Sequence, residues 1–222
     1  MNIRLLGATE VVVDGTTRPL GGPRQRAVLA DLALHAGRAL MVSELIDDLW
    51  GGSPPPSAVH TIETYVSRLR RLLHVEGGPS VLVAGRSSYR LNVALGQVDA
   101  LSFGELAALG AAALDRGDAQ SAAGFYSSAL ALWHGPALAD VQDSAFAPIA
   151  ARRLESDRRA AFEFLADARL VLGQHREIVP ELEQAVALDP YRERFHAQLM
   201  VALYRCGRQA DALAAFQRAR SL

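Results

Sequence analysis

Four residues of one segment, spaced for a single helical face, carry side chains that can bind a nucleic-acid duplex. Thr61, Thr64, Arg68 and Arg71 follow one another at steps of three, four and three residues, so a helix places them within a narrow arc. An α-helix fits the major groove of DNA, where arginine can bond O6 and N7 of guanine together and threonine can contact methyl groups or phosphates. The spacing therefore predicts a DNA-reading face on which Arg68 meets the bases.

Further polar side chains surround this face. Arg70 and Arg71 stand where the helix would leave the groove, and we expect them to meet phosphates. His60, Tyr65 and Tyr89 could donate hydrogen bonds to phosphates as well. The sequence leaves a second interpretation open, in which the two tyrosines pack against neighbouring elements and His60 is merely exposed.

An apolar stripe on the other side of the same segment would hold the reading face in place. Val59, Ile62, Val66, Leu69 and Leu73 recur at steps of three and four, which predicts a core-facing stripe on a helix over residues 57–74. By itself, the pattern also fits an ordinary amphipathic helix with a solvated basic face. The elements on either side decide between these interpretations.

A second helix and a hairpin are predicted around the basic helix. Ser43 is expected to cap a helix that ends at Trp50, and the following Gly-Gly-Ser-Pro-Pro-Pro run must be a loop. Residues 81–84 and 89–93 read as two strands around a turn with Arg86 at its tip. An arginine on such a wing can enter the minor groove. Helix, turn, helix and hairpin together predict a winged helix.

The first 22 residues predict a small sheet ahead of these helices. Residues 3–6, 10–13 and 16–20 are β-type runs, and Asp14-Gly15 is a strong hairpin turn. Pro23 suits the first position of a helix that Gly37 would end. Residues 1–95 hold ten arginines and eight acids, whereas residues 96–222 hold thirteen arginines and sixteen acids. The net charge is therefore positive in residues 1–95 and negative in residues 96–222.

Residues 96–222 are rich in alanine and leucine and read as helix almost throughout. Three segments align from Gly117, Gly173 and Gly207, and the last two glycines are 34 residues apart, which is the tetratricopeptide period. Small and aromatic residues then recur at matching positions, and we expect Tyr126 and Trp133 to be packing residues. The predicted fold is mainly α with a small β component: a winged helix-turn-helix in residues 1–95, followed by an all-α, tetratricopeptide-like repeat domain in residues 96–222.

Composition and motifs argue against several other functions. All 23 basic residues are arginine, which excludes a lysine nucleophile, a pyridoxal Schiff base and a phosphate-loop lysine. The six histidines and Cys206 show no metal-ligand spacing, and no hydrolase elbow occurs. Asp47 and Asp48 are expected on an exposed helix face. We therefore expect no enzyme activity, no cofactor, no metal site and no membrane span.

The motifs together resemble a known family. Trp50-Gly51, then residues 64–73 (TYVSRLRRLL), then Tyr89-Arg90-Leu91 resemble the OmpR-type winged helix of the Streptomyces antibiotic regulatory protein (SARP) family. Ser88 stands where that family usually has glycine. Residues 189–193 (DPYRE) and 199–209 (LMVALYRCGRQ) resemble its bacterial transcriptional activator domain. The family's domain usually continues beyond Leu222, so we expect this chain to be either a shortened form or the ordered part of a longer protein.

The resemblance implies roles that the residue pattern alone does not show. It places Arg68 against bases and the wing in the minor groove, and it puts further residues against bases or backbone, namely Trp50, Thr61, Thr64, Tyr65 and Arg70. It implies a cytoplasmic, nucleoid-associated bacterial activator that binds promoter direct repeats as two copies. It further implies recruitment of RNA polymerase, through the sigma factor and the C-terminal domain of the polymerase α chain, at a secondary-metabolite gene cluster. The alternatives are a repeat scaffold for protein interactions and a repressor with the same DNA reader.

Overall fold

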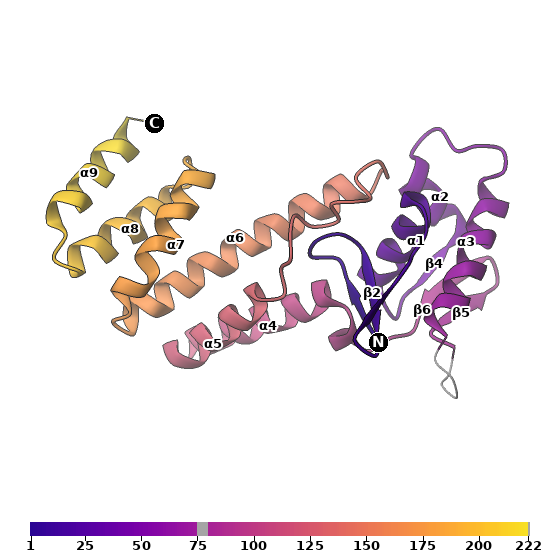
Figure 1. Cartoon of the computed structure of the whole chain (residues 1–222), viewed down its shortest axis with the longest axis horizontal. Coiled ribbons are helices and arrows are strands. Elements are labelled where there is room, and N and C mark those ends of the chain that lie inside the picture. Colours follow the sequence, from indigo (N-terminus) through magenta and orange to yellow (C-terminus); the bar gives the residue numbers. More distant parts are fainter. Residues whose placement is uncertain (75–79, 222) are drawn as a thin grey trace. The chain divides into compact units, whose positions relative to one another are not determined.

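The computed structural model describes residues 1–74 and 80–221, which form two compact units (Figure 1). The first unit contains Met1–Gly104 and Ala131–Asp157, and the second contains Glu105–Leu130 and Arg158–Leu222. These units differ from the sequence-based division after residue 95, because residues 131–157 group with the N-terminal residues. Each unit is considered by itself.

The first unit opens with an antiparallel sheet of three short strands. β1 (Asn2–Arg4), β2 (Glu10–Val13) and β3 (Thr16–Arg18) lie in chain order. The hairpin expected at Asp14-Gly15 is confirmed, since both residues have positive φ, at 51° and 77°. Glycine reaches this left-handed region without strain, which is why Asp-Gly favours such a turn.

Three helices follow and pack around one apolar core. They are α1 (Pro23–Leu34), α2 (Val42–Trp50) and α3 (Ala58–Leu73). Pro23 is the first helical residue, as predicted. The prediction that Ser43 caps α2 is wrong: the N-cap is Met41, two residues earlier, and its N–H donates to the Glu44 carboxylate at 2.7 Å.

The wing forms the second sheet. β4 (Ala39–Met41), β5 (Leu82–Gly85) and β6 (Ser88–Leu91) are antiparallel in the order β4-β6-β5, so β4 and β5 are its two edge strands. Arg86 and Ser87 make the two-residue turn between β5 and β6. The Val42 N–H at the start of α2 donates to the Ser87 carbonyl at 3.0 Å, which ties the wing tip to α2.

A segment far along the chain completes the first unit. Residues 131–146, which we call the strap, lie along the end of the first sheet: the backbone N–H groups of His134 and Leu138 donate to the carbonyls of Leu6 and Leu5 at 2.8 and 2.9 Å. The Asp140 carboxylate accepts from the Thr9 N–H at 2.8 Å and pairs with Arg26 of α1 at 2.7 Å. The strap thereby joins the first sheet to the helices.

Other contacts of the strap reach α2 and its own unit's core. The Phe146 N–H donates to the Asp48 carbonyl at 3.0 Å. Trp133 is 8% exposed and meets the Phe103 ring edge-on at 5.5 Å, so its expected packing role is confirmed. Backbone hydrogen bonds, one buried ring and an ion pair therefore hold residues 131–146 in the winged-helix unit.

The second unit is built from helices that pack in succession. α4 (Asp99–Asp115) enters this unit at Glu105, and α6 (Ala147–Val171) enters it at Arg158. α5, α7, α8 and α9 complete it, as Ala119–Leu130, His175–Leu188, Glu193–Arg205 and Gln209–Arg220. Figure 1 shows α7, α8 and α9 as neighbouring, successive helices, in orange to yellow. The structure thus confirms a mainly helical protein with small sheets.

The aligned glycines and aromatic residues explain how the repeats turn and pack. Gly117, Gly173 and Gly207 each end a helix-linking turn with φ of 75°, 79° and 79°, a conformation that favours glycine. Tyr126 is 1% exposed, stacks on Phe164 at 5.7 Å and lies against Gly110, so its expected packing role is also confirmed. Within the described residues, no helix is long and apolar enough to cross a membrane.

Candidate nucleic-acid interface

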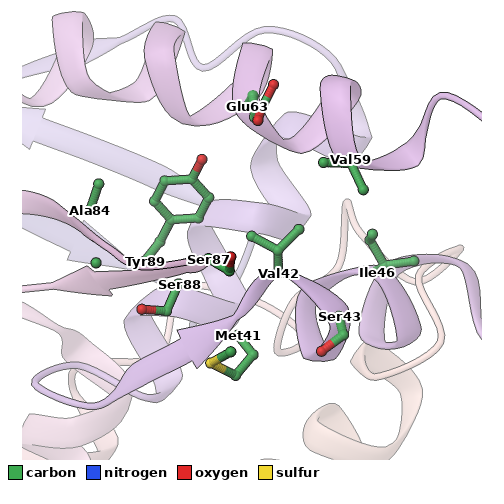
Figure 2. A pocket seen from close by; sticks show the side chains of 11 residues that line it. Met41, Val42, Ser43, Ile46, Val59, Glu63, Ala84, Ser87, Ser88 and Tyr89 are labelled. Atoms are coloured by element: carbon green, nitrogen blue, oxygen red, sulfur yellow. The ribbon is translucent and has the colours of Figure 1, made fainter.

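One face of α3 is anchored in the core. Ile62 and Leu69 are fully buried, and Val66 and Leu73 are each 1% exposed. Val59 departs from the predicted stripe, because it is 52% exposed while Ala58 takes the buried position at 4%. Ala58 rather than Val59 therefore makes the first core contact of α3, and Val59 lines the groove beside the wing (Figure 2).

The opposite face of α3 is polar and open to solvent. His60, Arg68 and Arg71 are exposed, and Thr61 and Thr64 are half-buried. The Thr61 hydroxyl donates to the Ser57 carbonyl at 2.9 Å, so an intrahelical hydrogen bond already fixes its direction. The His60 imidazole lies 3.7 Å from the Glu63 carboxylate, with both side chains largely exposed. The structure thus gathers the predicted strip on one accessible surface.

Two exposed residues of this face are absent from the predicted strip. Ser67 lies between Thr64 and Arg71 on the helical surface, and Glu63 lies on the edge towards the wing. The 100° spacing that identified the threonines also places Ser67 in the open arc, so this signal was available in the sequence. Glu63 is an acid on an otherwise basic face and is expected to repel phosphates.

Arg70 has a different environment from the two arginines beside it. Its Nε donates to the Leu82 carbonyl of β5 at 2.9 Å, and its guanidinium carbon lies 6.0 Å from the centre of the Tyr89 ring of β6. Arg70 is half-buried, whereas Arg68 and Arg71 are exposed. Arg70 and Arg71 also lie in the last turn of α3, where positive charge offsets the negative end of the helix dipole.

The wing tip carries an exposed arginine on a defined turn. Arg86 is exposed, and Ser87 adopts a positive φ of 55°. Ser88 lies in β6, so the family's usual glycine position does not require positive φ here. A Cβ at Gly85 would lie 2.5 Å from the Ser88 Oγ, so a side chain there would require the Ser88 hydroxyl to rotate away. Ser88 and Gly85 face each other across the hairpin.

A shallow groove of about 530 Å³ separates the first turns of α3 from the wing (Figure 2). Its walls are mainly apolar, with Val42 and Ile46 from α2, Val59 from α3 and Tyr89 from β6. In Figure 2 the Tyr89 ring rises from the wing strand towards α3. The groove therefore lies directly between the two elements that the sequence assigns to DNA.

Trp50 and Tyr65 occupy intermediate positions. Trp50 is half-buried at the end of α2, and the guanidinium carbon of Arg24 lies 5.1 Å from the centre of its ring. Tyr65 is half-buried on the flank of α3 that faces away from Val59. Both rings have accessible edges and both contribute packing, so the structure brings them to the border of the predicted surface.

An acidic cluster lies between α1 and α2, behind the reading face. Asp31 is fully buried, and its carboxylate lies 3.1 Å from the His35 Nδ1, which raises the pKa of His35. Burial and the neighbouring Asp31 carboxylate raise the pKa of Asp48 to about 6. Asp48 is half-buried, so the prediction that it lies on an exposed face is wrong. In the described parts of the chain, no group of three or more histidine, cysteine or acidic side chains could hold a metal ion.

Comparisons with known proteins agree with this architecture. Residues 18–91 match the family described as "Transcriptional regulatory protein, C terminal", and residues 98–222 match the "Bacterial transcriptional activator domain". Regulatory protein AfsR of Streptomyces coelicolor is 40% identical over 98% of this chain and 22% of its own length. Regulatory protein DnrI of Streptomyces peucetius is 36% identical over 97% of this chain and 82% of its own length.

A solved structure shares the fold over nearly the whole chain. The structure of Mycobacterium tuberculosis EmbR in complex with a low affinity phosphopeptide superposes with a TM-score of 0.93 and 36% identity, over 99% of this chain and 59% of that one. The chain spans about a fifth of the AfsR proteins that it matches. Winged helix, helical repeats and both matched domains place this chain in the SARP family of bacterial transcriptional regulators.

Proposed function

We propose that this protein is a sequence-specific DNA-binding activator of transcription. The observation that carries the proposal is the polarity of α3. Ile62 and Leu69 fix one face in the core, and Thr64, Arg68 and Arg71 stand on the opposite, accessible face. A helix held this way presents guanidinium and hydroxyl groups to a major groove without first rearranging.

In this proposal the side chains divide into base-reading and phosphate-binding groups. Arg68 bonds a guanine bidentately, and Thr61 and Thr64 contact thymine methyl groups or the backbone. His60 and Arg71 approach phosphates at the border of the groove. Trp50 and Tyr65 pack against the sugar-phosphate backbone on the flank of α3.

The wing would reach the neighbouring minor groove. Arg86 is exposed at the tip, and a narrow minor groove attracts an inserted arginine. One DNA strand would then cross the groove between α3 and the wing, where Val59 and Tyr89 offer apolar surface to its deoxyriboses. The hydroxyl groups of Ser43, Ser87 and Ser88 line the same groove and can donate to phosphates.

Membership of a family of transcriptional regulators supports a regulatory output. We propose that two copies bind direct repeats in a promoter and recruit RNA polymerase through the sigma factor and the C-terminal domain of the polymerase α chain. The helical-repeat unit would supply protein-binding surface, as stacked helix pairs commonly do. The regulated genes would form a biosynthetic gene cluster, and the protein would act in the bacterial cytoplasm.

Footprinting on genomic fragments, with and without purified polymerase, tests the proposal. We expect a protected pair of repeats, and an affinity that falls by orders of magnitude between about 50 and 200 mM salt if several phosphates are neutralised. Transcription from the same fragment with purified polymerase should increase on addition of the protein. A decrease in transcription would instead identify the protein as a repressor. An absence of any salt-dependent DNA binding would favour a protein-interaction scaffold.

A further inference from the structure

We propose that Arg70 is a positioning residue that fixes the wing against α3, so that both elements meet the DNA as one preorganised surface. The inference rests on the proposed DNA-binding function. It assigns Arg70 a role distinct from that of the arginines on either side, which the basic run alone does not distinguish. The contacts made by its guanidinium carry the argument.

Arg70 joins α3 to both strands of the hairpin. Its Nε donates to the Leu82 carbonyl of β5 at 2.9 Å, and its guanidinium carbon lies over the Tyr89 ring of β6, 6.0 Å from the ring centre. Leu82 lies on β5, an edge strand that pairs only with β6. The Arg70 bond is therefore a side-chain link from the recognition helix to a strand that has no sheet neighbour on its other side.

The opposite end of the wing is tied to a different element. The Val42 N–H donates to the Ser87 carbonyl at 3.0 Å, which holds the tip at the start of α2. The base of the wing at Leu82 is held from α3 by Arg70. Together with the β4–β6 ladder, these two attachments at opposite ends fix the direction of the hairpin.

The link depends on the shape of arginine as well as on its charge. The Nε–H is a directional donor in the guanidinium plane, and the central carbon of the same group lies over an aromatic ring. Lysine keeps the charge and cannot make both contacts with one planar group. Arg70→Lys therefore separates a positioning role from simple attraction to phosphates, for which a lysine would serve.

Free-protein dynamics provide the first test. Native-state hydrogen exchange is measured on the β5 and β6 amides of the parent, Arg70→Lys and the matched control Arg71→Lys, in the whole chain without DNA. We expect exchange in these strands to become at least about fivefold faster in Arg70→Lys and to stay at the parent rate in Arg71→Lys. Equal exchange in Arg70→Lys and the parent would overturn the proposal.

DNA binding provides the second test, as a double-mutant cycle on the footprinted promoter fragment. We expect Arg70→Lys to weaken binding about tenfold with an unchanged salt slope, and to change it less than about twofold in the Arg86→Ala background, where the wing no longer contributes its arginine. Arg176→Lys, at an exposed arginine of α7, is the control for DNA binding and should bind like the parent. A full Arg70→Lys effect in the Arg86→Ala background would contradict coupling through the wing.

The two measurements separate failure of this inference from failure of the proposed function. Were the parent not to bind any promoter fragment, the DNA-binding function and the coupling claim would both fall, while the exchange data would still decide whether Arg70 holds the wing. Thermal unfolding of each variant confirms that it is folded under the conditions of both assays.

Discussion

The carboxyl groups of Asp31 and Asp48 meet between α1 and α2, where the Asp31 side chain is completely buried. Burial and the neighbouring Asp31 carboxylate both disfavour the charged form of Asp48, and they raise its pKa to about 6. His35 lies on the other side of Asp31, with its Nδ1 3.1 Å from a carboxylate oxygen. The stability of the α1–α2 packing therefore depends on the protonation of Asp48 and His35.

The stability of the first unit should fall as pH rises. The pKa of Asp48 is raised from 3.8 to about 6 by burial and by the Asp31 charge, so the native state binds more protons than the unfolded state between those values. The stabilisation from protonated Asp48 is complete below about pH 4, and it is lost as the pH rises through about 6. The raised pKa of His35 extends the loss to higher pH.

Urea unfolding of Asp48→Asn from pH 5 to 8 checks this sign. We expect the variant to unfold with less pH dependence than the parent and to gain on the order of 1 kcal/mol relative to it at pH 7.5, a figure discounted for partial exposure. Asp47→Asn, an exposed neighbour, is the matched control and should keep the parent profile. If the unfolding free energy of Asp48→Asn changed with pH as much as that of the parent, Asp48 would not titrate as described.

Arg68→Ala should weaken cognate DNA binding and relax base preference. Loss of a bidentate contact with guanine costs about 1–3 kcal/mol and removes discrimination at that base pair. Competition binding against a library randomised at each operator position measures both effects. Arg176→Ala, at an exposed arginine of α7, is the control and should leave affinity and preference unchanged. An unaltered preference profile for Arg68→Ala would show that α3 is oriented differently on DNA.

Gly110→Ala should destabilise the second unit. A Cβ at this position would lie 2.8 Å from two carbons of the Tyr126 ring, which is closely packed and 1% exposed. Overpacking of this kind costs about 1–3 kcal/mol. Gly124→Ala in α5 is a matched control with no atom near the added carbon, and it should stabilise by up to about 1 kcal/mol. Chemical denaturation of both variants gives the change in unfolding free energy. A loss at Gly110 with a gain at Gly124 would show that contact with the Tyr126 ring outweighs helix propensity.

Asp140→Ala should destabilise the first unit although the residue lies far from α3 in the sequence. It removes an acceptor for the Thr9 N–H and the partner of Arg26, and hydrogen bonds to charged groups contribute about 1.5–3 kcal/mol. Asp143→Ala, at an exposed acid of the same strap, should change stability by less than about 0.5 kcal/mol. Equal unfolding free energies for the two variants would mean that the strap is not held at Asp140.

Local patterns were sufficient to predict most of the elements. The Asp-Gly hairpin, the Pro23 helix start and the apolar stripe of α3 each depend on near neighbours in the chain, and the structure confirms them. The stripe fails at its first position, because a periodicity of 3.6 does not say whether Ala58 or Val59 faces the core. The family match confirms the two kinds of domain that the motifs indicated.

Non-local contacts were beyond the reach of the sequence patterns. Nothing in the run Ser67-Arg68-Leu69-Arg70-Arg71 marks one arginine as a partner of a strand carbonyl, because that partner is 12 residues away in another element. The raised pKa of Asp48 likewise depends in part on Asp31, which lies in a different helix. Whether the DNA-contacting residues have the predicted roles stays a prediction until binding is measured.

Residues 131–157 interrupt the second half of the sequence and yet complete the first compact unit. We therefore expect that the winged helix cannot be exchanged at residue 95 without also exchanging the strap that packs on it. A chimera joined there would pair one regulator's sheet and helices with another regulator's strap, and Thr9 and Arg26 would face a foreign residue in place of Asp140. Grafting a new operator preference onto this scaffold therefore calls for substitutions on α3 and the wing, with the chain around them left intact.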